Sequence, residues 1–199
     1  MEQLIPLITD LADVFRRVQL RFAFGGALAN NYWGIVRTTQ DVDCLVSIPA
    51  LKYQLLADAL GSIGCHMWDA SGAPVPITVR RMREQVEQRK MIECTRAGIR
   101  AELFVPVVPL QHEILRRAVL MPFQDQKIPV TTAEDLILLK MAFHREKDLY
   151  DVRGMLWVQR GRLDLEYLRK WSARTLEDRA QEELEGLIQQ YAAGPEASS

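Results

Sequence analysis

The chain has 199 residues, of which 48% are hydrophobic and 26% are charged, and its formal net charge is −1. This length can bury a sizeable core in one domain or a compact pair, and the composition excludes a disordered or fibrous protein. The near-zero charge disfavours an indiscriminate polyanion binder, although a local basic face for nucleic acid is compatible with it.

Three cysteines, Cys44, Cys65 and Cys94, form neither a disulfide framework nor a zinc site by spacing, which favours reduced thiols. The first residues carry acids early and lack the basic start and long apolar run of a secretory signal. No apolar run reaches the length that a membrane span needs. We therefore expect a cytoplasmic protein without a membrane partner.

The first part of the chain predicts a small sheet flanked by helices. Apolar residues at helical spacing over residues 2–19 predict an amphipathic opening helix. The next predicted elements are a strand at 22–24, a helix at 27–33 ended by Gly34, and a strand at 41–46. A helix follows at 50–63, with Leu51, Leu55, Leu56 and Leu60 inward and Gly64 as its cap. After a loop at 65–76, strands are predicted at 91–95 and 99–105.

The segment 77–90 is basic and mixed, with arginine or lysine at positions 80, 81, 83, 89 and 90. Such a segment can hold a nucleic-acid backbone if it flanks a cleft. Glu84 and Glu87, however, indicate ordinary ion pairing on a helix. We favour a solvated helix face.

The second part of the chain predicts helices almost throughout. They are expected at 110–119, 132–144, 145–158, 164–172 and 175–191, with a short extended piece at 127–130 and a mobile tail at 192–199. Thr132 and Asp135 form a variant of the capping box at the start of the helix expected at 132–144. We expect an α+β domain over residues 1–125 and a helical domain over residues 126–199, packed together.

One stretch, residues 22–46, carries most of the predicted chemistry. Gly25-Gly26 follows an apolar strand and precedes a helix, a turn whose exposed amides suit phosphate. The period of two along the next strand sends Asp41 and Asp43 to the same face. Two carboxylates this close favour a cation between them, and oxygen ligands suit Mg²⁺. A phosphate cradle beside a magnesium clamp indicates phosphoryl or nucleotidyl transfer.

These residues resemble the nucleotidyltransferase superfamily, whose signature is a Gly-Gly or Gly-Ser turn followed by an Asp-x-Asp strand. The stretches GGALANNYWG and RTTQDVD are most similar to the AbiEii-like toxins of toxin and antitoxin pairs. The gap between Gly26 and Asp41 is slightly longer than the usual signature. The resemblance implies a small mixed sheet that carries the metal and a helical bundle that closes the nucleotide cleft.

The resemblance also implies roles for residues outside the turn. Glu102 would be the third carboxylate, either ligating a second Mg²⁺ or accepting the proton of the attacking hydroxyl, with Glu93 as the fallback. The proposed nucleotide contacts are Gly25 and Gly26 on the β- and γ-phosphates, Arg37 and Thr38 on the triphosphate, Lys140 on a phosphate, and Asp148 and Asp151 in an R-x-K-D-x-x-D stretch that positions lysine and substrate. Each role has a plainer alternative. Gly25 and Gly26 are then ordinary turn glycines, and Arg37 pairs with Asp41 or Asp43. Lys140 extends its charged end into solvent, and Asp148 and Asp151 complement a helix dipole.

The sequence thus predicts an Mg²⁺-dependent nucleotidyltransferase, with two ions and an NTP as substrate. By resemblance the acceptor is an RNA 3′ end or a protein side chain, and an antitoxin protein is a possible partner. Two alternatives stay open. One is a nucleotidyltransferase that modifies small molecules of the aminoglycoside type, and the other is an inactive module that binds an NTP or a partner protein.

Overall fold

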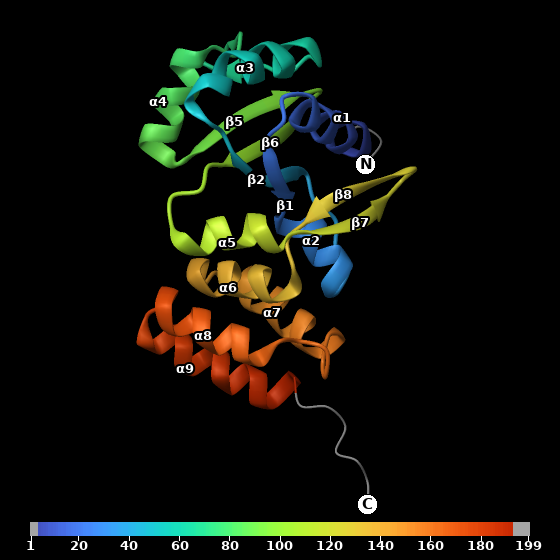
Figure 1. Cartoon of the computed structure of the whole chain (residues 1–199), viewed down its shortest axis with the longest axis vertical. Coiled ribbons are helices and arrows are strands. Elements are labelled where there is room, and N and C mark those ends of the chain that lie inside the picture. Colours follow the sequence, from blue (N-terminus) through green and yellow to red (C-terminus); the bar gives the residue numbers. More distant parts are fainter. Residues whose placement is uncertain (1–3, 193–199) are drawn as a thin grey trace, which may run out of the picture. The chain divides into compact units, whose positions relative to one another are not determined.

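The structure, a computed structural model, describes residues 4–192 of the chain. It divides into two compact units (Figure 1). Unit 1 comprises residues 4–26 and 38–130, and unit 2 comprises residues 27–37 and 131–192. The tail expected at 192–199 lies outside the described residues apart from Ala192, as do the first two residues of the helix expected at 2–19.

Unit 1 contains a mixed six-stranded sheet in the order β5-β6-β2-β1-β8-β7. Its strands are β1 Arg21–Phe24, β2 Asp41–Ser47, β5 Met91–Arg96, β6 Ile99–Phe104, β7 Val119–Phe123 and β8 Gln126–Val130. Strand β1 runs antiparallel to β2 and parallel to β8, while β2 runs parallel to β6. The outer pairs, β5 with β6 and β7 with β8, are antiparallel hairpins.

Helices cover this sheet because each presents an apolar face. The helices of unit 1 are α1 Leu4–Arg17, the 3₁₀ helix η1 Ala50–Lys52, α3 Tyr53–Ser62, α4 Val79–Arg89 and α5 Pro109–Arg117. Helices α1 and α5 both contact β1 and β2, whereas α4 packs on β5 and α3 packs on α1 and α4 (Figure 1). Phe15, Phe22 and Phe24 form an aromatic core, with ring centroids 5.0 and 5.7 Å apart in succession.

Unit 2 is helical. It contains α2 Gly26–Trp33 from its second residue onward, α6 Ala133–Phe143, α7 Glu146–Val158, α8 Leu165–Thr175, α9 Asp178–Leu187 and a π-helical turn η2 Ile188–Ala192. Helix α6 contacts α7, α8 and α9. The Thr132 hydroxyl accepts a hydrogen bond from the Asp135 amide at 3.2 Å, which confirms the predicted cap. No helix in the described range is long and apolar enough to span a membrane.

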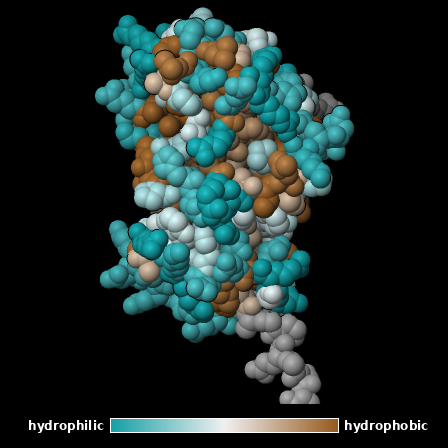
Figure 2. All heavy atoms as spheres, viewed as in Figure 1, coloured by the Kyte–Doolittle hydropathy of each residue, from teal (hydrophilic) through white to brown (hydrophobic). Residues whose placement is uncertain are grey.

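The α+β class with a mixed sheet and flanking helices is confirmed, and several local predictions are wrong. The segment 65–76 is not a plain loop, because β3 Met67–Trp68 and β4 Pro74–Val75 pair as a small hairpin. The helix expected to reach Val119 ends at Arg117, and Val119 begins strand β7. Leu51 and Leu55 are exposed rather than inward, because at about 100° per residue they fall on the side of the helix opposite to the buried Leu56 and Leu60. On the face shown in Figure 2, polar and apolar residues intermingle.

Candidate functional site

The glycine turn brings the two parts of the sequence motif into contact. Strand β1 ends at Phe24 and α2 begins at Gly26, so the predicted strand, turn and helix are confirmed. The Gly25 amide donates a hydrogen bond to the Asp43 carbonyl at 2.9 Å. Gly26 has φ +52°, and a β-carbon there would lie 1.7 Å from Asp43 Oδ2. Only glycine therefore lets the Asp43 carboxylate lie against the turn.

Three carboxylates form a row across neighbouring strands. Asp43 on β2 is the register partner of Glu102 on β6, and Glu102 is in turn the partner of Glu93 on β5. Register partners project to the same face of a sheet, and neighbouring strands lie about 4.8 Å apart, so Asp43 and Glu93 are separated by roughly 10 Å of sheet. Both Glu102 and its fallback Glu93 thus share the face of Asp43.

Arg100 places a positive charge against this row. Its Nε lies 3.1 Å from Glu102 Oε1, and its Nη2 donates to Asp41 Oδ2 at 3.4 Å. The charge of Glu102, aided by the Asp41 hydrogen bond, raises the pKa of the Arg100 guanidinium. On its other side Asp41 Oδ1 accepts a hydrogen bond from the Thr39 hydroxyl at 2.6 Å. The acidic face therefore attracts a cation, and in this structure it holds a guanidinium.

The donor set suits Mg²⁺ chemically, because Asp41, Asp43 and Glu102 offer hard carboxylate oxygens. Within residues 4–192, however, no three His, Cys, Asp or Glu side chains are grouped closely enough to hold an ion as they stand. Asp41 and Glu102 are turned to Arg100 instead. For all three carboxylates to hold a metal, Arg100 has to release Asp41 and Glu102.

Unit 2 holds a second cluster, built around Lys140. This lysine is 5% exposed, and its Nζ lies 2.6 Å from Asp151 Oδ2 and 3.5 Å from Asp148 Oδ1. Arg145 Nε donates to Asp148 Oδ2 at 2.6 Å. Burial alone would raise the pKa of Asp148, but the Arg145 hydrogen bond and the charge of Lys140 together bring it below its ordinary value. The plainer alternative for Lys140, a charged end in solvent, is therefore excluded. Asp148 does lie in the first turn of α7, where an acid also complements the helix dipole.

Arg37 belongs to the same cluster rather than to the carboxylates of β2. Its guanidinium donates to both carboxylate oxygens of Asp151 at 3.1–3.3 Å, so its expected alternative pair with Asp41 or Asp43 is not observed. The Asn31 side chain fixes the Arg37 backbone through two hydrogen bonds of 2.9 Å. Cations and carboxylates thus alternate through the cluster, in the order Arg37, Asp151, Lys140, Asp148 and Arg145.

Three residues of these clusters were missed by the sequence interpretation. Arg100 stands two positions before Glu102 on one strand, so the period of two could have placed both on one face. The hydroxyl that contacts Asp41 belongs to Thr39, whereas Thr38 is exposed. Asn31 carried no signal, because its partner Arg37 is reached only when the loop after α2 folds back.

Comparisons with known proteins identify a family and a fold. Residues 9–196 match the family described as nucleotidyl transferase AbiEii toxin, Type IV TA system. No curated protein matches the chain. A crystal structure of an antigenic nucleotidyltransferase-like protein from Paracoccidioides brasiliensis is 13% identical with a TM-score of 0.48, covering 97% of this chain and 95% of that one.

Two structures of the antibiotic-resistance factor ANT(2″)-Ia share the fold. Its solution structure is 10% identical with a TM-score of 0.51, covering 95% of this chain and 92% of that one. Its crystal structure with adenylyl-2″-tobramycin is 11% identical with a TM-score of 0.51, covering 96% and 98%. Since the family match extends over nearly the whole sequence, this chain belongs to the AbiEii family of nucleotidyltransferase toxins and is itself a nucleotidyltransferase.

Proposed function

We propose that the protein transfers a nucleoside monophosphate from an NTP to an acceptor hydroxyl in an Mg²⁺-dependent reaction. The observation that carries this proposal is the Asp43 carboxylate held against Gly26, at the point where helix α2 begins. A helix start beside a carboxylate places amide donors for phosphate next to a ligand for a cation. Nucleotidyl transfer requires both within one site.

The chain's own residues have separate roles in this reaction. The Gly26 amide at the start of α2 holds the β- and γ-phosphates, because the Gly25 amide expected to do so already donates to the Asp43 carbonyl. Asp41 and Asp43 would hold Mg²⁺ beside them. Mg²⁺, when bound, supplies charge neutralisation on the phosphates. Glu102 accepts the proton of the acceptor hydroxyl, whose oxygen forms the bond to the α-phosphorus while the bond to the bridging oxygen breaks and pyrophosphate leaves. Catalysis then depends on positioning and electrostatics.

Further roles concern unit 2 and the partners. Lys140 contributes positive charge to nucleotide binding, and Asp148 and Asp151 hold it in place. The acceptor hydroxyl belongs to an RNA 3′ end or a protein side chain, and a cognate antitoxin silences the enzyme in the cytoplasm. These roles rest on membership of a toxin family.

A transfer assay tests the proposal. The protein is incubated with Mg²⁺, each labelled NTP and, in separate reactions, total RNA, a protein extract or an aminoglycoside panel. The double variant Asp41→Asn, Asp43→Asn should abolish label transfer, whereas Asp13→Asn, an exposed acid of α1 that pairs with Arg16, should not change it. Unchanged transfer by the double variant would refute the proposed site. Nucleotide binding without pyrophosphate release would instead favour the inactive binding module.

A further inference from the structure

The Thr39 hydroxyl forms a short, local hydrogen bond with the first carboxylate of β2. Its Oγ1 donates to Asp41 Oδ1 at 2.6 Å, a length typical of a hydroxyl bound to an ionised carboxylate, about 2.5–2.7 Å. In the opposite direction, the Asp41 amide donates to Thr39 Oγ1 at 3.4 Å. Thr39 is half-buried and lies in the loop just before β2. One oxygen of Asp41 is therefore held on the side of this loop.

The other oxygen of Asp41 faces the neighbouring strand. Asp41 is the register partner of Arg100 on β6, and Arg100 Nη2 donates to Asp41 Oδ2 at 3.4 Å. The same guanidinium lies 3.1 Å from Glu102 Oε1 through its Nε. A cation that takes the place of the guanidinium between these two carboxylates would therefore meet Oδ2 of Asp41, whereas Oδ1 is engaged by the Thr39 hydroxyl.

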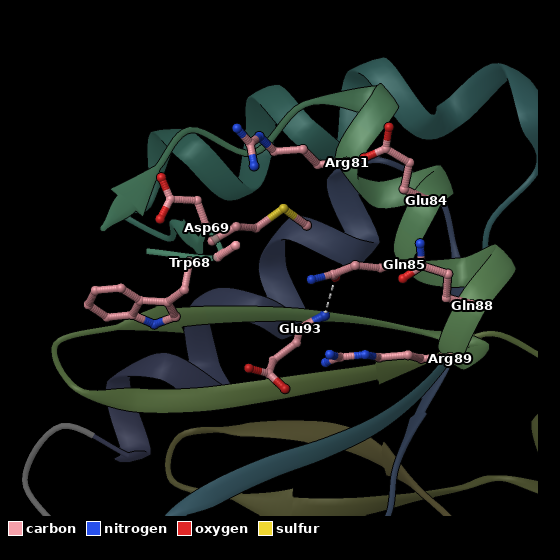
Figure 3. Close-up of a pocket in the computed structure, with 10 residues that line it drawn as sticks. Trp68, Asp69, Arg81, Glu84, Gln85, Gln88, Arg89 and Glu93 are labelled. Carbon is pink, nitrogen blue, oxygen red and sulfur yellow. Dashed lines mark hydrogen bonds between the residues drawn. The ribbon is translucent and has the colours of Figure 1, made fainter. Parts of the chain in front are cut away.

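Glu93, at the other end of the carboxylate row, has different surroundings. It lines a polar pocket between β5 and helix α4 (Figure 3). Its backbone amide donates to the Gln85 side-chain Oε1 at 2.8 Å, which ties this part of β5 to α4 (Figure 3). Within residues 4–192, Arg100 forms ion pairs with Asp41 and Glu102 and none with Glu93. The position of the guanidinium therefore indicates that a cation is held between β2 and β6.

Mg²⁺ and Ca²⁺ use the two oxygens of a carboxylate differently. Mg²⁺ demands near-octahedral geometry at about 2.0–2.1 Å, which a carboxylate satisfies best through one oxygen. Ca²⁺ takes about six to eight oxygens at about 2.3–2.6 Å and binds a carboxylate through one oxygen or through both. A carboxylate with one oxygen engaged by a hydroxyl still offers the other to Mg²⁺, but it loses the two-oxygen mode that only Ca²⁺ uses readily.

We propose that Thr39 is a positioning residue that sets the metal specificity of the site. Its hydroxyl holds Asp41 so that the carboxylate binds a cation through Oδ2 alone, which favours Mg²⁺ over Ca²⁺. Partners that orient a metal-binding side chain in this way typically change metal affinity about 10–100-fold. The inference rests on the proposed function for the placement of the ion at Asp41. It goes further, because it assigns the choice between two ions to a residue that contacts neither.

The test is isothermal titration calorimetry of the full-length protein with Mg²⁺ and, separately, with Ca²⁺, in the absence of NTP. Thr39→Val keeps the shape of the side chain and removes the hydroxyl, so it should weaken Mg²⁺ binding about tenfold and Ca²⁺ binding less than about threefold. Thr39→Ser retains the hydroxyl and should keep both affinities within about twofold of the wild type. Thr175→Val is the matched control, because Thr175 Oγ1 also donates a 2.6 Å hydrogen bond, but to the Trp171 carbonyl in α8. It should change neither affinity.

Asp41→Asn separates this inference from the proposed function. In that background Thr39→Val should have no further effect on either ion, since the carboxylate that the hydroxyl holds is gone. An unchanged ratio of the Mg²⁺ and Ca²⁺ affinities in Thr39→Val would overturn the role of Thr39, while the proposed transfer reaction stands. Mg²⁺ binding that the double variant Asp41→Asn, Asp43→Asn leaves unchanged would refute the metal site itself, and the role of Thr39 with it. Melting temperatures of all variants, measured without metal, exclude unfolding as the cause of a loss.

Discussion

Asp43 Oδ2 occupies the space beside Gly26, 1.7 Å from the point where a β-carbon on that glycine would lie. The glycine and the carboxylate are therefore one unit, and neither can change without moving the other. This relationship gives the sharpest prediction for the site.

Gly26→Ala should displace the Asp43 carboxylate and reduce transfer about 100-fold, because displacements near 1 Å at a reacting centre have effects of that order. The positive φ also costs about 1–2 kcal/mol for alanine. Gly64→Ala is the matched control, since Gly64 has φ +81° and nothing lies within 4 Å of its added β-carbon. It should lose similar stability and keep its activity. Equal activity losses in both variants would mean that the contact with Asp43 is irrelevant.

Arg100→Ala should strengthen Mg²⁺ binding about three- to tenfold, because the guanidinium that pairs with Asp41 and Glu102 no longer competes with the ion. Without Mg²⁺ the variant should melt earlier than the wild type, since the carboxylates then lack their counter-charge. Thermal melting at a series of Mg²⁺ concentrations measures both effects. Arg80→Ala, which removes an exposed ion pair elsewhere, should shift neither. Weaker Mg²⁺ binding by Arg100→Ala would show that Arg100 does not compete.

Lys140→Met should destabilise the protein by about 3 kcal/mol, because it leaves Asp148 and Asp151 buried with fewer cations. Urea unfolding at neutral pH measures the change. Lys147→Ala, an exposed lysine in helix α7, should be nearly neutral. If Lys140→Met lowers the free energy of unfolding by less than about 1 kcal/mol, the buried cluster stabilises the protein no more than an exposed ion pair does.

The lowered pKa of Asp148 predicts how the free energy of unfolding changes at acidic pH. Its folded pKa lies below the ordinary value of about 3.9, so its contribution is fully present above that value and is lost as pH falls through the lower, folded pKa. Asp148→Asn should be less stable than the wild type at pH 7 and should lose less stability below about pH 4. Urea midpoints between neutral and acidic pH test this. Parallel curves for the two proteins would contradict it.

The sequence predicted the local parts of the site because they depend on short-range rules. Gly25-Gly26 between an apolar strand and a helix, and the alternation that sets Asp41 and Asp43 on one face, both follow from residues within one short stretch. The register of Glu102 with Asp43 joins strands far apart in sequence, and the resemblance rather than the pattern suggested it.

Long-range partners and very short strands could not be predicted. Arg37 contacts Asp151, 114 residues further along, and nothing near Arg37 indicates that partner. Strands β3 and β4 have two residues each, which is too short for a period of two to appear. The inward face of the helix after Pro49 was misjudged because the leucines at 51 and 55 were grouped with those at 56 and 60, although at about 100° per residue the two pairs fall on opposite sides.

The interleaving of the two units along the chain limits how the protein can be dissected in the laboratory. Residues 27–37 belong with the C-terminal helices, where Trp33 Nε1 donates to the Thr131 carbonyl at 2.7 Å and Gln159 donates to the Trp33 carbonyl at 2.9 Å. A fragment that starts after the sheet would lack these anchors, and a fragment that ends before β8 would expose β1 as a new edge. Separate expression of either unit therefore calls for a circularly permuted or split gene that returns helix α2 to its neighbours.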